Sequence, residues 1–291
     1  MKIICYVLAR QGSSRIPNKN MMKFNGRETI LRTFDQVRKI KYLDNFYLAT
    51  TDSRKDDEIA SLAEKNEIDA FRGHEEYVLD RVYEAARKHR ADVILYASGD
   101  GPLIDPIIYS NILNFYKQND YDLVTCYEPQ TFPGGYDFNI INFKSLELAY
   151  KSALAPSQRI NMFSYFTFHP EIIKTYNYSN DVNLSNYHLS LDNPEDIKFF
   201  QKFFYLADEL KIEINLKNTL QLINENKELK LLSLQIEDPY ASHALFNSIH
   251  ILKGFFQDID ELLTRAIREN DERKRDILIK ESILIASKIG K

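Results

Sequence analysis

Short apolar runs alternate with amphipathic helical patterns along residues 1–210, and this alternation constrains the fold more than any other feature. A strand that is followed by a helix returns to the sheet by a crossover, which makes the strands parallel and covers both faces of the sheet with helices. The predicted strands cover 3–8, 45–50, 70–72, 93–97, 123–127, 138–142 and 188–191. The predicted helices cover 29–40, 56–66, 77–88, 106–118 and 194–210. We therefore expect an α/β protein with a largely parallel sheet.

Composition limits the class of protein. The chain has 291 residues and is 44% hydrophobic, which suits one large α/β domain or a domain with an appendage. Its two cysteines lie in apolar runs, so we expect free thiols and a cytoplasmic location. We expect no signal peptide and no membrane span, because no apolar stretch reaches roughly 18 residues. The net charge of -4 disfavours a general nucleic-acid surface.

A cationic loop follows the first predicted strand. The loop carries Arg10, Arg15 and Lys19 together with glycine and serine. Backbone N–H groups and cations that converge at the end of a strand suit a polyphosphate, so a nucleoside triphosphate is the expected ligand. The spacing matches neither the Walker A pattern nor the dinucleotide pattern GxGxxG. Lys23 and Arg27, further along, are expected to be ordinary surface charges.

Polar residues also follow other predicted strands, and ligands of parallel sheets bind at these carboxyl ends. Thr51 and Asp52 follow the second strand, and Asp100 follows the fourth, in ASGDGPLIDP. A carboxylate opposite a phosphate loop could hold a divalent metal, or it could cap a helix, as we expect of Asp105. Asp192, in LSLDNPEDI, leaves the same two alternatives open.

Four ordered motifs resemble a known family, the cytidylyltransferases that include CMP-Kdo synthetase, CMP-sialic acid synthetase and the spore coat polysaccharide protein SpsF. The SpsF-like branch is the most similar. Its pattern ARxxSxRxPxK matches 9–19, and its GDxPLIDP matches 99–106. FRGHEEYVLDRVYEAA at 71–86 and LDNPEDI at 191–197 match two further segments. The resemblance covers roughly residues 1–230.

This resemblance implies both a fold and a reaction. The fold is a three-layer α/β/α nucleotide-diphospho-sugar transferase sheet, GT-A-like and Rossmann-like, over 1–230. The change in sequence character after about residue 230 separately predicts a helical appendage over 231–291. The enzyme would transfer CMP from CTP to a sugar acid, sugar phosphate or related surface-polysaccharide precursor and release pyrophosphate. Phosphoryl-type transfer depends mainly on positioning and electrostatics, so no protein nucleophile is required.

The family pattern also assigns site residues. Arg10, Lys19 and Asp100 would be catalytic, and Asp100 and Asp192 would hold Mg2+. The residues implied for binding of CTP are Leu8, Ala9, Arg10, Gly12, Ser13, Arg15, Lys19, Thr51, Asp52, Arg72 and Gly73.

Acceptor residues follow less directly. The implied set is Asp80, Arg81, Asp137, Asn139 and Arg159, and as neighbours on a helix Asp80 and Arg81 cannot both face the ligand. Asn139 stands where the family pattern has glutamate, and 160–161 read Ile-Asn where Glu and His are expected. Either the acceptor differs chemically from that of typical members, or these positions lie outside the site.

Two other functions remain open. A glycosyltransferase that uses a nucleotide sugar usually has a DxD motif, and the chain reads GDG there. A nucleotide-binding subunit without turnover would have no electrostatic reason to keep the charged loop and the two aspartates. The histidines show no zinc-ligand spacing. Residues 243–288 predict two or three amphipathic helices that pack on the core or on a second subunit. The expected partners are CTP, a small acceptor and a second copy of the chain, without nucleic acid or membrane.

Overall fold

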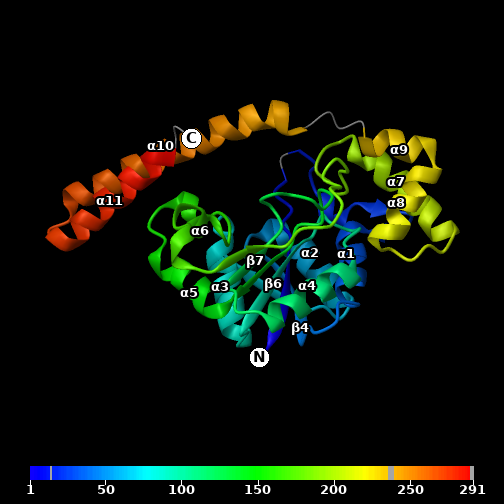
Figure 1. The fold of residues 1–291 in the computed structure, drawn as a ribbon, viewed down its shortest axis with the longest axis horizontal. Helices are drawn as coiled ribbons and strands as arrows, with labels where there is room; N and C mark the ends of the chain where they lie inside the picture. The colour runs from blue at the N-terminus through cyan, green and yellow to red at the C-terminus, as the bar shows by residue number, and fades with distance from the viewer. Residues whose placement is uncertain (14, 235–238, 289–291) are drawn as a thin grey trace.

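The computed structural model describes residues 1–13, 15–234 and 239–288, and side chains in these ranges except 234–253 and 288. In this part of the chain a seven-stranded sheet has the order β5-β4-β1-β6-β8-β7-β9 (Figure 1). The strands are β1 (Ile3–Leu8), β4 (Asn45–Thr51), β5 (Ala70–Gly73), β6 (Val93–Ser98), β7 (Leu123–Thr125), β8 (Asn139–Asn142) and β9 (Thr175–Asn177). A separate two-stranded hairpin joins β2 (Lys23–Phe24) to β3 (Arg27–Glu28).

Helices cover both faces of the sheet. The helices of the α/β core are α1 (Thr29–Val37), α2 (Asp57–Lys65), α3 (Val78–His89), α4 (Pro106–Gln118), α5 (Phe143–Ser152), α6 (Ser164–Phe168) and α7 (Asp196–Glu209). Single 3-10 turns are η1 (Lys19–Met21), η2 (Arg54–Asp56), η3 (Pro156–Gln158) and η4 (Pro170–Ile172). The remaining helices are α8 (Leu216–Glu225), α9 (Lys227–Leu234), α10 (Pro239–Arg268) and α11 (Glu272–Lys288).

Strand side chains alternate between two hydrophobic layers. In β1, Ile3, Cys5 and Val7 pack with α1, α4 and α7, whereas Ile4 and Tyr6 pack with α3 and α5. This period of two, with both faces apolar, explains why the strand is a continuous hydrophobic run. Both cysteines, at positions 5 and 126, are buried and free.

The predicted α/β class is confirmed, with a mixed sheet. β5, β4, β1 and β6 run parallel, whereas β8 pairs antiparallel with both β6 and β7. The predicted strand at 188–191 is wrong: His188 makes only an isolated bridge with Gly134. Gly135, with φ of +93°, turns the chain away there, so no ladder continues. The elements α5, α6, α8, α9, β9 and the β2–β3 hairpin were not predicted.

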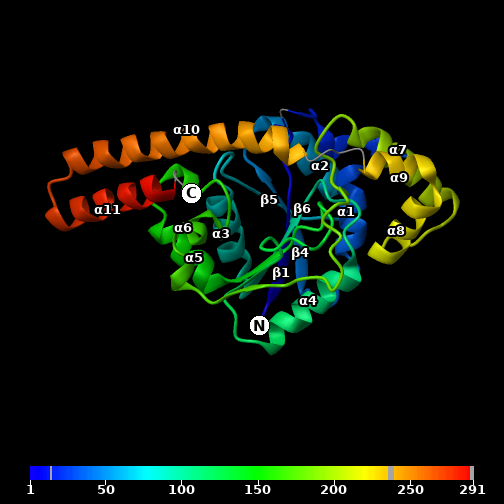
Figure 2. The ribbon, with the colours of Figure 1, turned by 45° about the horizontal axis from the view of Figure 1, so that its top comes forward.

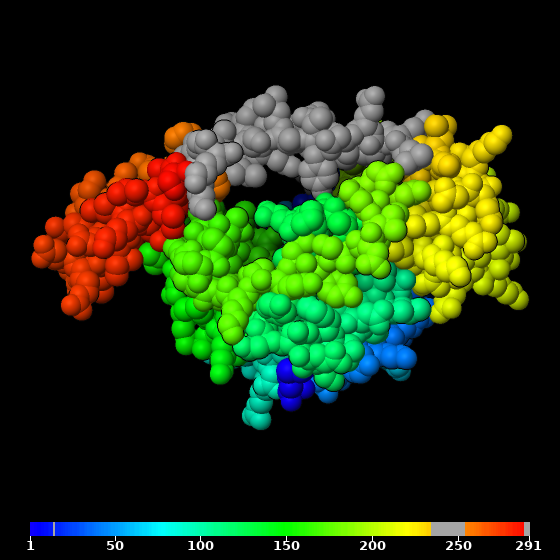
Figure 3. All heavy atoms as spheres, in the orientation of Figure 1, coloured from blue at the N-terminus to red at the C-terminus, as the bar shows by residue number. Residues whose placement is uncertain are grey.

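The C-terminal helices form two separate groups. α8 and α9 pack beside α7, and Leu229 of α9 belongs to the main core. α10 and α11 form an antiparallel pair that projects beyond the α/β core (Figures 1 and 3). Leu262, Ala266, Leu278 and Ile285 of this pair bury one small cluster against Ala155 and Phe168. The expected boundary after residue 230 falls inside α9, and the division into two domains stays a prediction. No described helix is long and apolar enough to cross a bilayer.

Candidate active site

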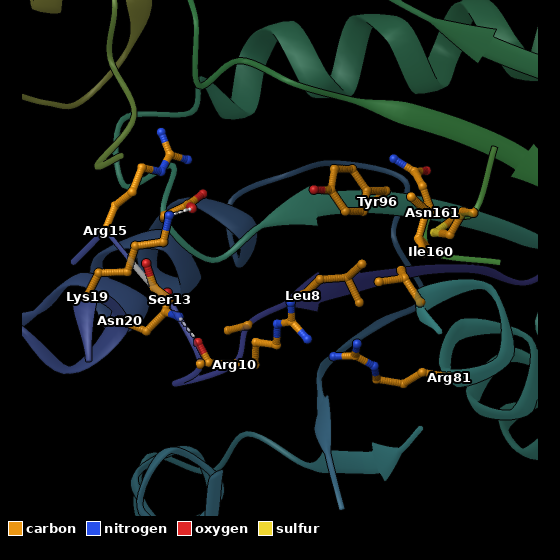
Figure 4. Close-up of a pocket in the computed structure, with 15 residues that line it drawn as sticks. Leu8, Arg10, Ser13, Arg15, Lys19, Asn20, Arg81, Tyr96, Ile160 and Asn161 are labelled. Carbon is orange, nitrogen blue, oxygen red and sulfur yellow. Dashed lines mark hydrogen bonds and ion pairs between the residues drawn. The ribbon is translucent and has the colours of Figure 1, made fainter. Parts of the chain in front are cut away.

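Hydrogen bonds and one buried side chain fix the conformation of the loop after β1. Gln11 N–H donates to the buried Asp56 Oδ1 at 2.7 Å, and Asn20 Nδ2 donates to the Arg10 carbonyl at 3.1 Å. Ile16 anchors the middle of the loop in the hydrophobic core. Arg10, Ser13 and Arg15 of this loop line a cavity (Figure 4).

Lys19 joins two aspartates from distant parts of the chain. Its Nζ pairs with Asp100 and lies 3.1 Å from Asp192 Oδ1, and it also donates to the Leu191 carbonyl at 3.1 Å. Arg15 Nη2 approaches Asp192 Oδ1 at 3.4 Å. Asp192 does not cap a helix, because α7 begins at Asp196. Asp105 does cap α4, as predicted, by accepting from the amides of the second and third helical residues.

Backbone contacts explain why these aspartates meet. Gly99 N–H donates to the Leu8 carbonyl at 2.9 Å, which joins the ends of β6 and β1. A Cβ at Gly99 would lie 2.8 Å from Ala9 Cβ, so the approach requires glycine. The segment before Asp192 is then tied to the same edge, because Leu191 N–H donates to the Asp100 carbonyl at 3.1 Å.

The charges of this cluster stabilise one another. Burial lowers the pKa of Lys19, but the carboxylates of Asp100 and Asp192 outweigh it and hold the pKa above its usual value. Burial raises the pKa of Asp192, but the Lys19 ammonium, the Ser190 hydroxyl and His188 together outweigh burial, so the net shift is downward. Ser98 Oγ donates to Asp100, and Ser190 Oγ donates to Asp192 Oδ2 at 2.6 Å, so a hydroxyl orients each carboxylate.

A cavity of about 350 Å3 opens beside this cluster at the carboxyl ends of β1 and β6. Figure 4 shows Lys19 and Arg15 at one end of it, Tyr96 and the 160–161 segment at the other, and Leu8 between them. Arg81 reaches the cavity from α3, and burial together with Arg10 lowers the pKa of its guanidinium to about 10. The complete lining is Leu8, Ala9, Arg10, Gly12, Ser13, Arg15, Lys19, Asn20, Val78, Arg81, Tyr96, Asp100, Ile160, Asn161 and Met162.

The loop residues predicted for CTP are therefore brought together around the cavity. The residues predicted for CTP from β4 and β5 do not line it. Thr51 is buried and its hydroxyl donates to Asp56. Arg72 donates from Nε to the Thr51 carbonyl at 2.9 Å and pairs with Asp57 at 2.6 Å. Asp52, Arg72 and Gly73 form the adjoining edge of β4 and β5 and do not line the cavity.

The predicted acceptor residues are dispersed. Asp80 and Arg159 pair with each other at 2.7 Å, whereas their neighbour Arg81 alone lines the cavity. Asn139 is buried in β8, where its Nδ2 donates to the Tyr127 hydroxyl at 3.2 Å. Asp137 is half-buried near the aspartate pair. Their roles in acceptor binding stay predictions.

Several lining residues carried no sequence signal. Val78 and Met162 are apolar residues in a helix and a loop, and Tyr96 is a strand residue among other apolar ones. Asn20 lay one position beyond the matched motif, so the motif itself gave it no role. His188 also approaches the cluster, with its Nε2 3.3 Å from Asp196 Oδ2 and 3.9 Å from Asp192 Oδ2.

The pH dependence of the protein's stability is expected to report on Asp137. Burial, with the charges of Asp100 and Asp192, raises the pKa of Asp137 to about 6. The folded state then binds this proton more tightly than the unfolded state, so stability falls as pH rises from the ordinary value of 3.8 to about 6. Asp137→Asn should raise the free energy of unfolding above that window and change it little below. Urea unfolding at both ends measures this, and a variant that is less stable at neutral pH would contradict it.

The cluster fits a magnesium ion by its donor set. Asp100 and Asp192 converge on one cationic group, and Mg2+ is commonly held by one or two carboxylates together with substrate phosphates. Among the described residues, no group of three or more His, Cys, Asp or Glu side chains is arranged to hold a metal by itself. A metal here would therefore need oxygen ligands from a bound triphosphate.

The fold and the cationic cavity define a nucleotidyltransferase, and comparison with known proteins gives the family. Residues 4–232 match the family model described as cytidylyltransferase. The chain belongs to the cytidylyltransferase family and is an enzyme of that class.

Individual proteins are similar to this chain over most of its length. The chain is 28% identical over 235 residues to an uncharacterized protein of Methanocaldococcus jannaschii, covering 79% of this chain and 93% of that one. It is 24% identical to the spore coat polysaccharide biosynthesis protein SpsF of Bacillus subtilis, covering 78% and 95%. A cytidylyltransferase structure from Leptospira borgpetersenii superposes with a TM-score of 0.73 at 25% identity, over 79% of this chain and 96% of that chain.

Proposed function

We propose that this enzyme transfers CMP from CTP to a hydroxyl oxygen of a sugar acid or related surface-polysaccharide precursor, with Mg2+, and releases pyrophosphate. The observation that carries the proposal is the Lys19 ammonium between Asp100 and Asp192, at one end of a cavity that Arg10, Arg15 and Arg81 also line. Four cations around a small cavity suit a polyanion, and the two carboxylates suit its counter-ion.

Binding of the triphosphate would redistribute these charges. Arg10 and Arg15 would grip phosphate oxygens with their planar guanidinium groups, and Lys19 would exchange its carboxylate partners for phosphate. Asp100 and Asp192, released from Lys19, would hold the metal on the α-phosphate. Bound there, Mg2+ would neutralise the charge that develops on the phosphoryl oxygens. Leu8 and Ala9, at the end of β1, would lie against the base.

The transfer itself needs few protein groups. The acceptor oxygen forms a bond to the α-phosphorus while the bond from that phosphorus to the pyrophosphate oxygen breaks. The acceptor proton leaves to water or to a neighbouring carboxylate, for which Asp137 is the candidate because its raised pKa of about 6 allows it to accept a proton near neutrality. The remaining residues align the reacting atoms and exclude water.

The class of acceptor is supported by named relatives. The chain is 31% identical over 133 residues to 8-amino-3,8-dideoxy-manno-octulosonate cytidylyltransferase of Shewanella frigidimarina, covering 43% of this chain and 52% of that one. A structure of CMP:2-keto-3-deoxy-manno-octonic acid synthetase complexed with CTP shares the fold at 16% identity and a TM-score of 0.56.

Pyrophosphate release tests the proposal. Purified enzyme is incubated with CTP, Mg2+ and a panel of sugar acids and sugar phosphates that includes both octulosonates. Release that requires CTP, metal and acceptor supports the proposal. CTP binding without release for any acceptor favours the non-catalytic subunit, and release with a nucleotide sugar favours the glycosyltransferase.

We further propose that the enzyme is a homodimer joined through α10 and α11. Among the side chains of this pair that the structure describes, six apolar ones are exposed, including Ile267 at 84% and Ile283 at 62%. Such a surface is typical of an interaction site. Light scattering is expected to give the mass of a dimer for the full chain and of a monomer for the double variant Ile267→Glu/Ile283→Glu. Lys280→Glu, an exposed change on the same helix, is the control. Equal masses for all three proteins would refute the interface.

A further inference from the structure

A second cavity, larger and more apolar than the first, lies where α10 packs against η3 and α6. Its volume is about 640 Å3, within the range of small-molecule sites. Figure 2 shows α10 running beside α6 at this place. We call it the α6–α10 cavity. Its lining is Pro156, Ser157, Ile160, Ser164, Thr167, Phe168, Gly254, Phe255, Gln257, Asp258 and Glu261.

Asp258, a buried carboxylate in this cavity, forms no ion pair with any side chain that the structure describes. Asp258 is only 2% exposed, and its Oδ1 accepts from the Ser157 amide at 3.4 Å, whereas its Oδ2 has no hydrogen-bond partner. The Ser157 hydroxyl is buried beside this carboxylate and, with the Ser157 amide, partly offsets the effect of burial on its pKa. Burial raises the pKa of the Asp258 carboxyl group. Buried carboxylates in folded proteins are normally paired, so a ligand that donates hydrogen bonds or carries positive charge would complete this one.

The charge of the lining favours a cation. Glu261 lies three residues after Asp258 on α10, so both carboxylates face the same side of the helix. Two like charges at this spacing repel each other, and no lysine or arginine occurs among the lining residues whose side chains the structure describes. An ammonium group between them would relieve the repulsion and satisfy the free oxygen of Asp258.

The space itself is left open by a glycine. Gly254 lies inside α10, where glycine is unfavourable for a helix. A Cβ built on it would meet no atom within 4 Å, so packing does not require glycine there. A larger side chain would instead project into the cavity.

This cavity adjoins the proposed CTP site. Ile160 lines both cavities, and its side chain is 55% exposed between them. In Figure 4 it lies at the end of the CTP cavity opposite Lys19, beyond Tyr96. A molecule that reacts beside Asp100 could therefore extend past Ile160 into the α6–α10 cavity.

We propose that the α6–α10 cavity is a subsite for the distal part of the acceptor, and that it selects an ammonium group at the distal end of that molecule. The inference rests on the proposed cytidylyl transfer. The subsite also gives a chemical reason for Ile160 at a position where the family pattern has a charged residue. Ile160 borders an apolar cavity, and the carboxylates of that cavity come from Asp258 and Glu261 of α10 instead.

Binding of a simple probe tests the subsite without knowledge of the acceptor. Hexylammonium, hexanol and hexanoate are titrated into the full-length enzyme by calorimetry at neutral pH, with CTP present. Hexylammonium is expected to bind roughly tenfold more tightly than hexanol, because a hydrogen bond to a charged group adds to burial of the chain, and hexanoate most weakly. Asp258→Asn should abolish the preference for the ammonium. Asp260→Asn, an exposed change on the same helix, should keep it.

A second variant, which fills the cavity without removing a charge, keeps the test valid if Asp258→Asn fails to fold. Gly254→Leu should fill the cavity and weaken binding of hexylammonium and hexanol alike, while it strengthens the helix. Equal affinity of the wild type for hexylammonium and hexanol, or an unchanged preference in Asp258→Asn, would overturn the subsite.

Turnover tests the link to the acceptor. 8-Amino-3,8-dideoxy-manno-octulosonate and 3-deoxy-manno-octulosonate differ by one amine in place of one hydroxyl. The amine is expected to have the higher kcat/KM, and Asp258→Asn should remove the difference. A higher kcat/KM for the hydroxyl compound would overturn the selectivity. Affinity of the wild-type enzyme for CTP is measured separately and distinguishes the two proposals. If the enzyme does not bind CTP, the cytidylyl transfer is refuted, and the hexylammonium titration alone then tests the cavity as a binding site.

Discussion

Replacement of Asp100 by asparagine is expected to lower cytidylyl transfer by about 10³-fold and to leave the fold intact. In the empty site Lys19 keeps its second partner, Asp192, so the substitution does not leave a buried cation unpaired. With CTP bound, however, one of the two carboxylates proposed for the metal would be lost, and the charge on the α-phosphate would be less well neutralised. The measurement is kcat for pyrophosphate release, with thermal unfolding as the check on folding.

Asp120→Asn is the matched control for this variant. Asp120 forms an exposed ion pair with Lys174 at 2.6 Å, far from the cluster in the fold, so the control should retain the wild-type rate. A wild-type rate in Asp100→Asn would show that Asp100 is not a metal ligand.

Replacement of Lys19 by methionine is expected to reduce kcat/KM for CTP by about 10²-fold to 10³-fold. It should also destabilise the enzyme without CTP, because Asp100 and Asp192 would lose the ammonium that they share and only the more distant Arg15 would remain beside Asp192. Because the pKa of Asp192 is lowered in the folded protein, its carboxylate stabilises the fold at pH values above the pKa that it has in the unfolded chain. This contribution is lost as the pH falls through the folded-state pKa. The difference in free energy of unfolding between the wild type and Lys19→Met should therefore be largest at neutral pH and smallest in acid.

The effect of Mg2+ on stability distinguishes loss of the Lys19 charge from a general loss of packing. Because the variant leaves two carboxylates without their ammonium, added Mg2+ should restore part of its stability to unfolding by urea. Lys23→Met is the control, since Lys23 is 62% exposed and pairs with Glu28 at 3.3 Å on the surface. A stability difference that is independent of pH and of Mg2+ would contradict the electrostatic account.

The sequence predicts the core of the fold because local periodicity and packing agree there. In β1 and β6 every residue is apolar or small, and each apolar side chain packs on one of two helical layers. The loop after β1 was found for the same reason: the strand ends where the apolar run ends, and the cations follow at once. The segment at 188–191 has a similar apolar pattern, but its hydrogen bonds go to a loop at Gly134 and to Asp100.

Contacts between distant segments could not be predicted in this way. Asp192 reaches Lys19 because backbone bonds at Leu191 and Gly99 tie three loops to one edge of the sheet. No local pattern indicates that Asp80 is paired with Arg159 and so differs from its neighbour Arg81. The α6–α10 cavity depends on how a C-terminal helix packs over a loop about a hundred residues earlier, and amphipathicity alone does not determine that packing.

The most direct test of the account is calorimetric titration of CTP, UTP, GTP and ATP into the wild-type enzyme and Asp100→Asn, each with and without Mg2+. The account predicts that the wild type binds CTP most tightly, that Mg2+ strengthens this binding, and that Asp100→Asn loses the effect of Mg2+. Equal affinity for the four nucleotides, or an effect of Mg2+ that survives in Asp100→Asn, would contradict it.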